Sequence, residues 1–290
     1  MKKMTVLSAL LSFVLLAGCG NAGGNNQDAG HGANHNEEHN QPDQHNEDGN
    51  HAGHGEEGEA AGDFRASFSF PAGSAQANEE TELQVQITDA AGTPVAEFEE
   101  NHEKLLHLII VNEDLSYFRH IHPDFKGDGT FAIRTAFPAG GKYKWFADFK
   151  PAGQAAATWS EWVEVEGEPA EKTAVTPDAQ LLKVVGDKEV ELALSGTKAN
   201  EEVTLTYEVR DAQTKEGIRD LEPYLGAIGH VVILSEDAEE YLHVHPLDEQ
   251  ATGPQAQFAT VFPHSGNYKI WAQFQHKGEV FTVPFVVKVG

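Results

Sequence analysis

The chain has almost no sulfur-containing side chains. Its 290 residues include one cysteine and two methionines, Met1 and Met4. A lone cysteine cannot form an intramolecular disulfide, and structural thiolate sites need several cysteines. A metal site in this chain therefore has to use imidazole and carboxylate groups. These donors suit Zn(II) or Cu(II) far better than Cu(I), which prefers sulfur.

Positive charge is also scarce. Twenty Lys and Arg residues stand against 46 Asp and Glu residues, a formal net charge of −26. Nucleic acids and anionic lipid surfaces are bound through clustered basic residues, and the sequence contains no such cluster. We therefore expect no nucleic-acid partner and no electrostatic adsorption to a membrane. The surplus acid is typical of a soluble secreted surface.

Long apolar runs are missing, and none could span a bilayer as a helix. The run Val6–Ala17 follows two lysines in the pattern of a signal peptide and leads into Leu16-Ala17-Gly18-Cys19. This ending resembles the lipobox of bacterial lipoproteins, which implies cleavage before Cys19 and lipidation of that residue. We expect residues 1–18 to be removed and the lipid to hold the protein at the extracytoplasmic face of the cell membrane.

Residues 19–63 lack Lys, Arg, aromatic residues and any aliphatic residue larger than Ala. Such a segment cannot bury enough surface to offset its ordering entropy, so we expect a disordered tether. Six histidines lie among its acidic residues: His31, His35, His39, His45, His51 and His54. Histidine-rich tracts bind metal weakly and multivalently. The alternative is a low-complexity spacer in which these histidines have no ligand role.

The rest of the chain contains an internal repeat. His107–Pro123 matches His230–Pro246 without a gap, and Phe137–Phe149 matches Phe262–Phe274. The offset is 123 residues in the first block and 125 in the second. This repeat predicts two related domains, at 64–167 and 176–290.

Each copy has the pattern of short β-strands, with runs that alternate or are solidly apolar between Gly, Pro, Asn and Asp. In the first copy these runs are Ala66–Phe70, Glu82–Thr88, Leu105–Val111, Tyr117–His122, Phe131–Phe137, Tyr143–Phe149 and Trp159–Val165. The number of strands is typical of an immunoglobulin-like sandwich, and Tyr143 and Tyr268 resemble its tyrosine corner. We predict an all-β chain of two tandem sandwiches, with a cupin-like barrel as the alternative. Irregular or one-turn helical segments are expected at Val95–His102 and Asp220–Leu225.

Each copy also carries a His-x-His-Pro motif with a third histidine upstream. If a four-residue loop joins the two strands, His107 lies directly opposite His120, and His122 lies two residues along on the same face. The equivalent residues of the second copy are His230, His243 and His245. Three imidazoles would then converge on one ion in each domain. A loop of odd length would turn His107 to the other face.

The alternative is that these histidines are core residues bonded to the backbone. Several buried imidazoles without partners would together cost several kcal/mol, which favours the metal interpretation. Five residues lack counterparts in the other copy and are expected to be peripheral: Glu100, His102, Glu103, His264 and His276.

The two motif blocks resemble those of poorly characterised secreted bacterial proteins that carry His-x-His-Pro motifs on immunoglobulin-like domains and are associated with metal handling. A more distant resemblance is to periplasmic copper chaperones, from which this chain departs because residues 19–290, the expected mature part, contain no methionine. Together with the histidine pattern, this resemblance indicates a non-enzymatic protein that captures, buffers or delivers Zn(II) or Cu(II). Its partners would be metal ions and a metal transporter.

Two other classes of function remain open. A His-ligated metalloenzyme would need an open coordination position. The sequence contains no H-E-x-x-H motif, Gly-rich phosphate loop or Ser/His/Asp order to support that class. A structural, adhesion or sensor module would use the histidines for packing or for a response to pH.

Overall fold

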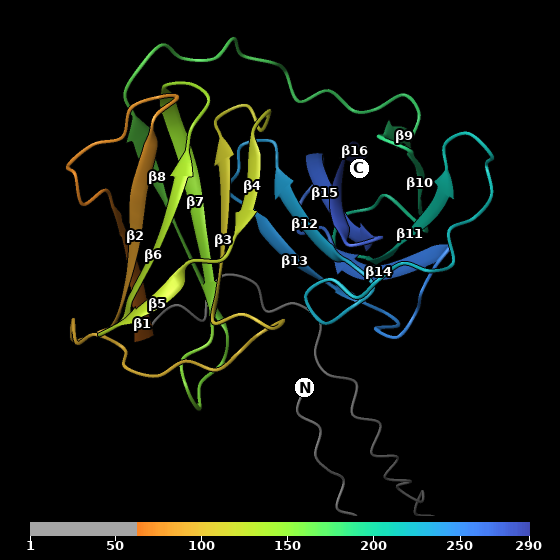
Figure 1. Ribbon diagram of the computed structural model, residues 1–290. Helices are drawn as coiled ribbons and strands as arrows, with labels where there is room; N and C mark the ends of the chain where they lie inside the picture. The colour runs from red at the N-terminus through yellow and green to blue at the C-terminus, as the bar shows by residue number, and fades with distance from the viewer. Residues whose placement is uncertain (1–62) are drawn as a thin grey trace, which may run out of the picture. The chain divides into compact units, whose positions relative to one another are not determined.

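The computed structural model describes residues 63–290 (Figure 1). The predicted signal peptide, the lipidation site Cys19 and the six tether histidines lie outside the described residues. All described residues belong to one compact unit of the chain. They contain no α-helix, and so none that could cross a membrane.

The first repeat is a sandwich of two antiparallel four-stranded sheets, ordered β1-β2-β6-β5 and β4-β3-β7-β8. Its strands are β1 (Phe64–Ser69), β2 (Glu80–Asp89), β3 (Leu106–Asn112), β4 (Phe118–Ile121), β5 (Asp124–Gly127), β6 (Thr130–Ala136), β7 (Gly141–Phe149) and β8 (Ala157–Val165). The first sheet has the A-B-E-D order of immunoglobulin domains. The second has the C-F-G order, with β4 added beside β3.

The second repeat has the same two layers, hydrogen-bonded into one order, β16-β15-β12-β13-β14-β11-β10-β9. Its strands are β9 (Leu182–Val185), β10 (Lys188–Leu194), β11 (Glu202–Asp211), β12 (His230–Ser235), β13 (Tyr241–Pro246), β14 (Gln255–Val261), β15 (Gly266–His276) and β16 (Glu279–Val289). The layers join because β13 pairs with β12 along most of its length and with β14 at His245 and Pro246.

Two tyrosine corners confirm the immunoglobulin-like prediction, and the cupin-like alternative is wrong. The Tyr143 hydroxyl donates to the Ala139 carbonyl at 2.8 Å, and the Tyr268 hydroxyl donates to the His264 carbonyl at 3.0 Å. In such folds this bond ties the start of a late strand to the loop before it. All seven strands predicted in the first repeat form, whereas the short strand β5 was not predicted. The two segments expected to be irregular or helical are irregular, with isolated bridges.

Strand β3 is buried on both faces, which explains its solidly apolar sequence. Leu108 and Ile110 pack in the core of the first sandwich. Ile109 and Val111 point the other way, because successive side chains of a strand alternate in direction. They are fully buried in a separate cluster that includes residues of the second repeat.

This separate cluster is the contact between the two repeats, and each repeat contributes the same positions to it. The equivalent pairs are Ile109 and Val232, Val111 and Leu234, Leu115 and Ala238, Phe118 and Tyr241, and Phe146 and Trp271. The Phe118 ring stacks on Trp271 with centroids 4.6 Å apart, and Phe146 stacks on Tyr241 at 5.1 Å. The contact is therefore self-complementary, like the isologous interface of a two-fold dimer.

Candidate metal centre

The register of the β3–β4 hairpin decides whether the first histidine set shares a face. Ile109 pairs with His120, and Val111 pairs with Phe118. The predicted register, with His107 opposite His120, is wrong by two residues. A shift of two residues preserves the face on which a side chain lies, so His107, His120 and His122 project from the same side of the hairpin.

The register differs because the connection is longer than the predicted four residues. The Asn112 side chain accepts a hydrogen bond from the Tyr117 amide at 2.8 Å, and Asp114 accepts one from the Ser116 amide at 3.0 Å. Leu115 adopts a left-handed conformation with φ of 57°. These side chains provide hydrogen bonds that pairing between the strands would otherwise provide in this loop. Pairing therefore begins with Val111 opposite Phe118, two residues later on the second strand than predicted.

The second hairpin has the same offset. Val231 pairs with Val244, and Val232 pairs with His243, where we predicted His230 opposite His243. The parity is again preserved. By backbone register alone, His230, His243 and His245 therefore belong to one face of this hairpin.

The three histidines of the first repeat converge. His107 Nδ1 lies 2.9 Å from His120 Nε2, which lies 3.2 Å from His122 Nε2. One nitrogen of each ring lies within 4.8 Å of the corresponding nitrogens of the other two. His107 is 1% exposed, and the other two are partly buried. His107, His120 and His122 thus form a group of three potential ligands that could hold a metal ion.

Hydrogen bonds to the outer ring nitrogens determine which nitrogens carry protons. His107 Nε2 lies 2.8 Å from the Asn101 carbonyl oxygen, which can only accept. His120 Nδ1 lies 2.7 Å from Gln273 Oε1, and the other end of that amide donates to Thr282 Oγ1 at 3.2 Å. Both outer nitrogens therefore donate, and the inner nitrogens of neutral His107 and His120 carry lone pairs.

Two lone pairs at this distance repel one another unless a cation or a shared proton lies between them. A tetrahedral ion with ligand bonds of about 2.0–2.1 Å separates its nitrogen donors by about 3.3 Å, close to the spacings observed. Burial lowers the pKa of His122 to about 3, with further lowering from His107 and Lys104. His122 is therefore neutral and able to act as a ligand near pH 7. The arrangement suits a divalent ion better than a proton.

One histidine of the second set, His230, lies beside the first set. The side chains of His243 and His245 lie outside the described residues, so the predicted second site stays a prediction. The His230 ring lies 4.6 Å from His120 by centroids, and it stacks on His107 at 5.6 Å with an interplanar angle of 8°. His102, expected to be peripheral, lies 5.8 Å from His230 and 6.1 Å from His107. Five ring systems therefore gather where the repeats meet. His102 gave no sequence signal, because it lies in an irregular segment and has no counterpart in the second copy.

Two polar residues beside the cluster were also missed. In the strand register, His107 on β3 lies opposite Asp148 on β7. At the equivalent place in the second repeat, His230 on β12 lies opposite Gln273 on β15. Both partners are buried, at 3% and 5% exposure. Burial, followed by the Asp148 charge, raises the pKa of Tyr241 well above its usual value, which places this carboxylate near the second repeat. A sequence signal was available, because Asp148 and Gln273 are polar residues at equivalent positions of the second repeated block.

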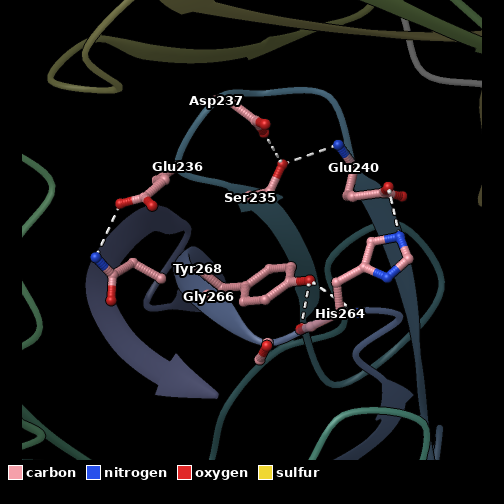
Figure 2. Close-up of a pocket in the computed structure, with 9 residues that line it drawn as sticks. Ser235, Glu236, Asp237, Glu240, His264, Gly266 and Tyr268 are labelled. Atoms are coloured by element: carbon pink, nitrogen blue, oxygen red, sulfur yellow. Dashed lines mark hydrogen bonds and ion pairs between the residues drawn. The ribbon is translucent and has the colours of Figure 1, made fainter. Parts of the chain in front are cut away.

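His264 and His276 lie elsewhere. His264 borders a small pocket beside the β12–β13 turn, where its Nε2 lies 3.4 Å from Glu240 (Figure 2). The other carboxylates there hold the turn: Asp237 accepts from the Ser235 hydroxyl, and Glu236 accepts from the Asn267 side chain. His276 Nε2 lies 3.2 Å from Asp220.

Fold and site together define a tandem immunoglobulin-like protein with a buried histidine cluster. A family model described as "Domain of unknown function (DUF8832)" matches residues 59–167 and again residues 183–290. The chain belongs to this family and contains two copies of its domain, which confirms the internal repeat.

No curated protein matches the chain significantly. Similar solved structures include the Escherichia coli adhesin FdeC, with 15% identity over 78% of this chain and 64% of that chain and a TM-score of 0.26. Invasin, a bacterial integrin-binding protein, has 14% identity over 77% of this chain and 39% of that chain, with a TM-score of 0.23. The Yersinia pseudotuberculosis adhesin InvE has 12% identity over 79% and 61%, with a TM-score of 0.24. Matches this weak carry no functional argument.

Proposed function

We propose that this protein captures and hands on Zn(II) or Cu(II) outside the cytoplasmic membrane, through a site formed by His107, His120 and His122. One observation carries the proposal. The inner nitrogens of His107 and His120 lie 2.9 Å apart, with the outer nitrogens placed against acceptors. Together with His122, this geometry presents three imidazole nitrogens at the spacing that a bound divalent ion requires.

The donor set supports these metals in particular. Three neutral imidazoles leave a fourth position for water or a nearby carboxylate, an arrangement common for Zn(II) and accessible to Cu(II). Such an open position also lets an ion leave, as delivery to a transporter requires. The described residues of this cluster offer no sulfur donor for Cu(I).

The N-terminal region completes the proposal. A lipid on Cys19 would hold the domains at the extracytoplasmic face of the membrane. The six tether histidines would collect ions weakly and raise their local concentration near the tight site. Fast exchange on the tether and slower exchange at the buried triad suit a protein that buffers metal.

The decisive experiment compares two double variants of the protein from which residues 21–62 have been deleted, purified without a His tag. Calorimetry with Zn(II) and Cu(II), supported by elemental analysis, should find a tight site that His120→Ala/His122→Ala removes. The control, His264→Ala/His276→Ala, changes the same number of histidines away from the cluster and should keep the site. Absence of tight binding in the parent protein would refute the proposal. Earlier melting of the first double variant with unchanged stoichiometry would assign the histidines to packing.

A further inference from the structure

We infer that the histidine site is shared between the two repeats: the second repeat closes it, so that metal binding and contact between the repeats stabilise each other. This inference rests on the proposed function and adds to it a second-repeat residue, Gln273, that positions a ligand. Three features of the described residues support it.

The first feature is the partner of His120. Its Nδ1 donates to Gln273 Oε1 at 2.7 Å, and Gln273 lies on β15 of the second repeat. The Gln273 amide is itself held by Thr282 on β16 and is 5% exposed. A metal-bound imidazole needs such an acceptor to fix its tautomer and ring orientation. For His120 that acceptor comes from the other repeat.

The second feature is the continuity of the site with the repeat contact. Along β3 the side chains of His107, Ile109 and Val111 follow one another on one face. Ile109 and Val111 are fully buried by the second repeat, and His107 is 1% exposed. On β4, Phe118 stacks on Trp271 two residues before His120. Separation of the repeats would therefore expose His107 and remove the acceptor of His120.

The third feature is the packing of His230, a residue of the second repeat, against two of the ligands. This residue is 4% exposed, and its ring lies against both His107 and His120. Two lysines also cross the contact at equivalent positions: Lys144 pairs with Glu239 at 2.9 Å, and Lys269 donates to the Leu115 carbonyl at 2.7 Å. These polar bonds hold the repeats in one orientation. The ligands are thereby organised before the ion binds.

Metal binding and contact between the repeats are thermodynamically linked. If contact between the repeats raises metal affinity by some factor, metal must strengthen that contact by the same factor. Couplings of this kind are typically about 5- to 150-fold in affinity. A substitution that weakens the contact without touching a ligand should therefore weaken metal binding.

The experiment uses the full chain and measures zinc affinity by competition with a zinc chelator. The chelator removes zinc from the weak tether sites, so the competition measures the tight site. Trp271→Ala removes the stack on Phe118, and Gln273→Ala removes the acceptor of His120. Each should weaken zinc binding by about tenfold, within the range for coupled sites. Gln273→Glu keeps an acceptor and should retain affinity within about twofold of the parent, a small change on the same scale. Trp159→Ala, a matched change in the first core away from the contact, should leave affinity unchanged.

Hydrogen exchange supplies an independent measurement, because it does not depend on how a variant folds. Zinc added to the unmodified protein should slow exchange in residues 236–240, which belong to the second repeat although the ligands belong to the first. Two results together would overturn the shared site. The first is that folded Trp271→Ala and Gln273→Ala bind zinc as tightly as the unmodified protein, and the second is that zinc leaves exchange at 236–240 unchanged. They would leave the proposed function intact. Absence of tight binding in the unmodified protein would refute the proposed function itself.

Discussion

His107 Nδ1 and His120 Nε2 face one another at 2.9 Å, and both are acceptors in the neutral rings. The protons lie on the outer nitrogens because the Asn101 carbonyl and the Gln273 amide oxygen receive them. Ordinary hydrogen bonding pairs a donor with an acceptor, so this relationship calls for a metal ion or a shared proton between the two rings.

The tether should bind metal ions without adding to the thermal stability of the two domains. Deletion of residues 21–62 is expected to lower the number of zinc or copper ions bound per chain, because six histidines are removed. The melting temperature of the metal-free protein should stay the same, since a segment without large apolar residues adds nothing to a core. Elemental analysis and calorimetric melting measure the two quantities. A large loss of thermal stability would show that the segment packs on the domains.

Acid should destabilise the metal-free protein through His122. Its pKa is lowered to about 3 in the folded protein, from 6.5. The unfolded chain therefore binds this proton more readily, and stability rises with pH between these values. Stability should be full above about pH 6.5, the reference histidine pKa, and should be lost as pH falls toward 3. Urea melts in the presence of a chelator should show this trend.

The matched variants for this prediction are His122→Gln and His264→Gln. The first removes the titrating ring and should flatten the loss of stability between these pH values. The second changes a ring that is 71% exposed and should leave the profile as it is. An unchanged slope in His122→Gln would assign the acid sensitivity to other groups.

The tyrosine corners should each stabilise the fold through the hydrogen bond from the hydroxyl to a backbone carbonyl. Tyr143→Phe and Tyr268→Phe keep the ring but remove the hydroxyl that reaches a backbone carbonyl. Each should cost about 0.5–1.5 kcal/mol of unfolding free energy. Tyr207→Phe is the control, because that hydroxyl is buried without a hydrogen-bond partner among the described residues. Its removal should be neutral or stabilising, and an equal loss in all three variants would mean that the corner bonds add nothing.

Much of the fold could be predicted because strand alternation is local. Leu83, Val85 and Ile87 alternate into the core of the first sandwich, as their spacing indicates. The shared face of His107 and His120 depended only on the parity of a loop. The register itself was predicted wrongly, because the Asn112 and Asp114 side chains form turn bonds that strand pattern does not reveal.

The position of His230 beside the first histidine set could not be predicted from either repeat alone. Ile109 and Val111 carried a signal, since a strand that is apolar on both faces needs a cover on both. The sequence does not say what that cover is. Because the second repeat provides it with the same face, His230 is brought to His120, and Gln273 becomes the acceptor of a ligand in the other repeat.

The central claim is that His107, His120 and His122 bind one ion, and zinc K-edge X-ray absorption tests it most directly. The sample is the protein lacking residues 21–62, loaded with one equivalent of zinc. We expect three imidazole nitrogens at about 2.0–2.1 Å, identified by scattering from the outer ring atoms, with one oxygen donor, and loss of the imidazole signature in His120→Ala/His122→Ala. A spectrum dominated by oxygen donors, or one that the double variant leaves unchanged, would contradict it.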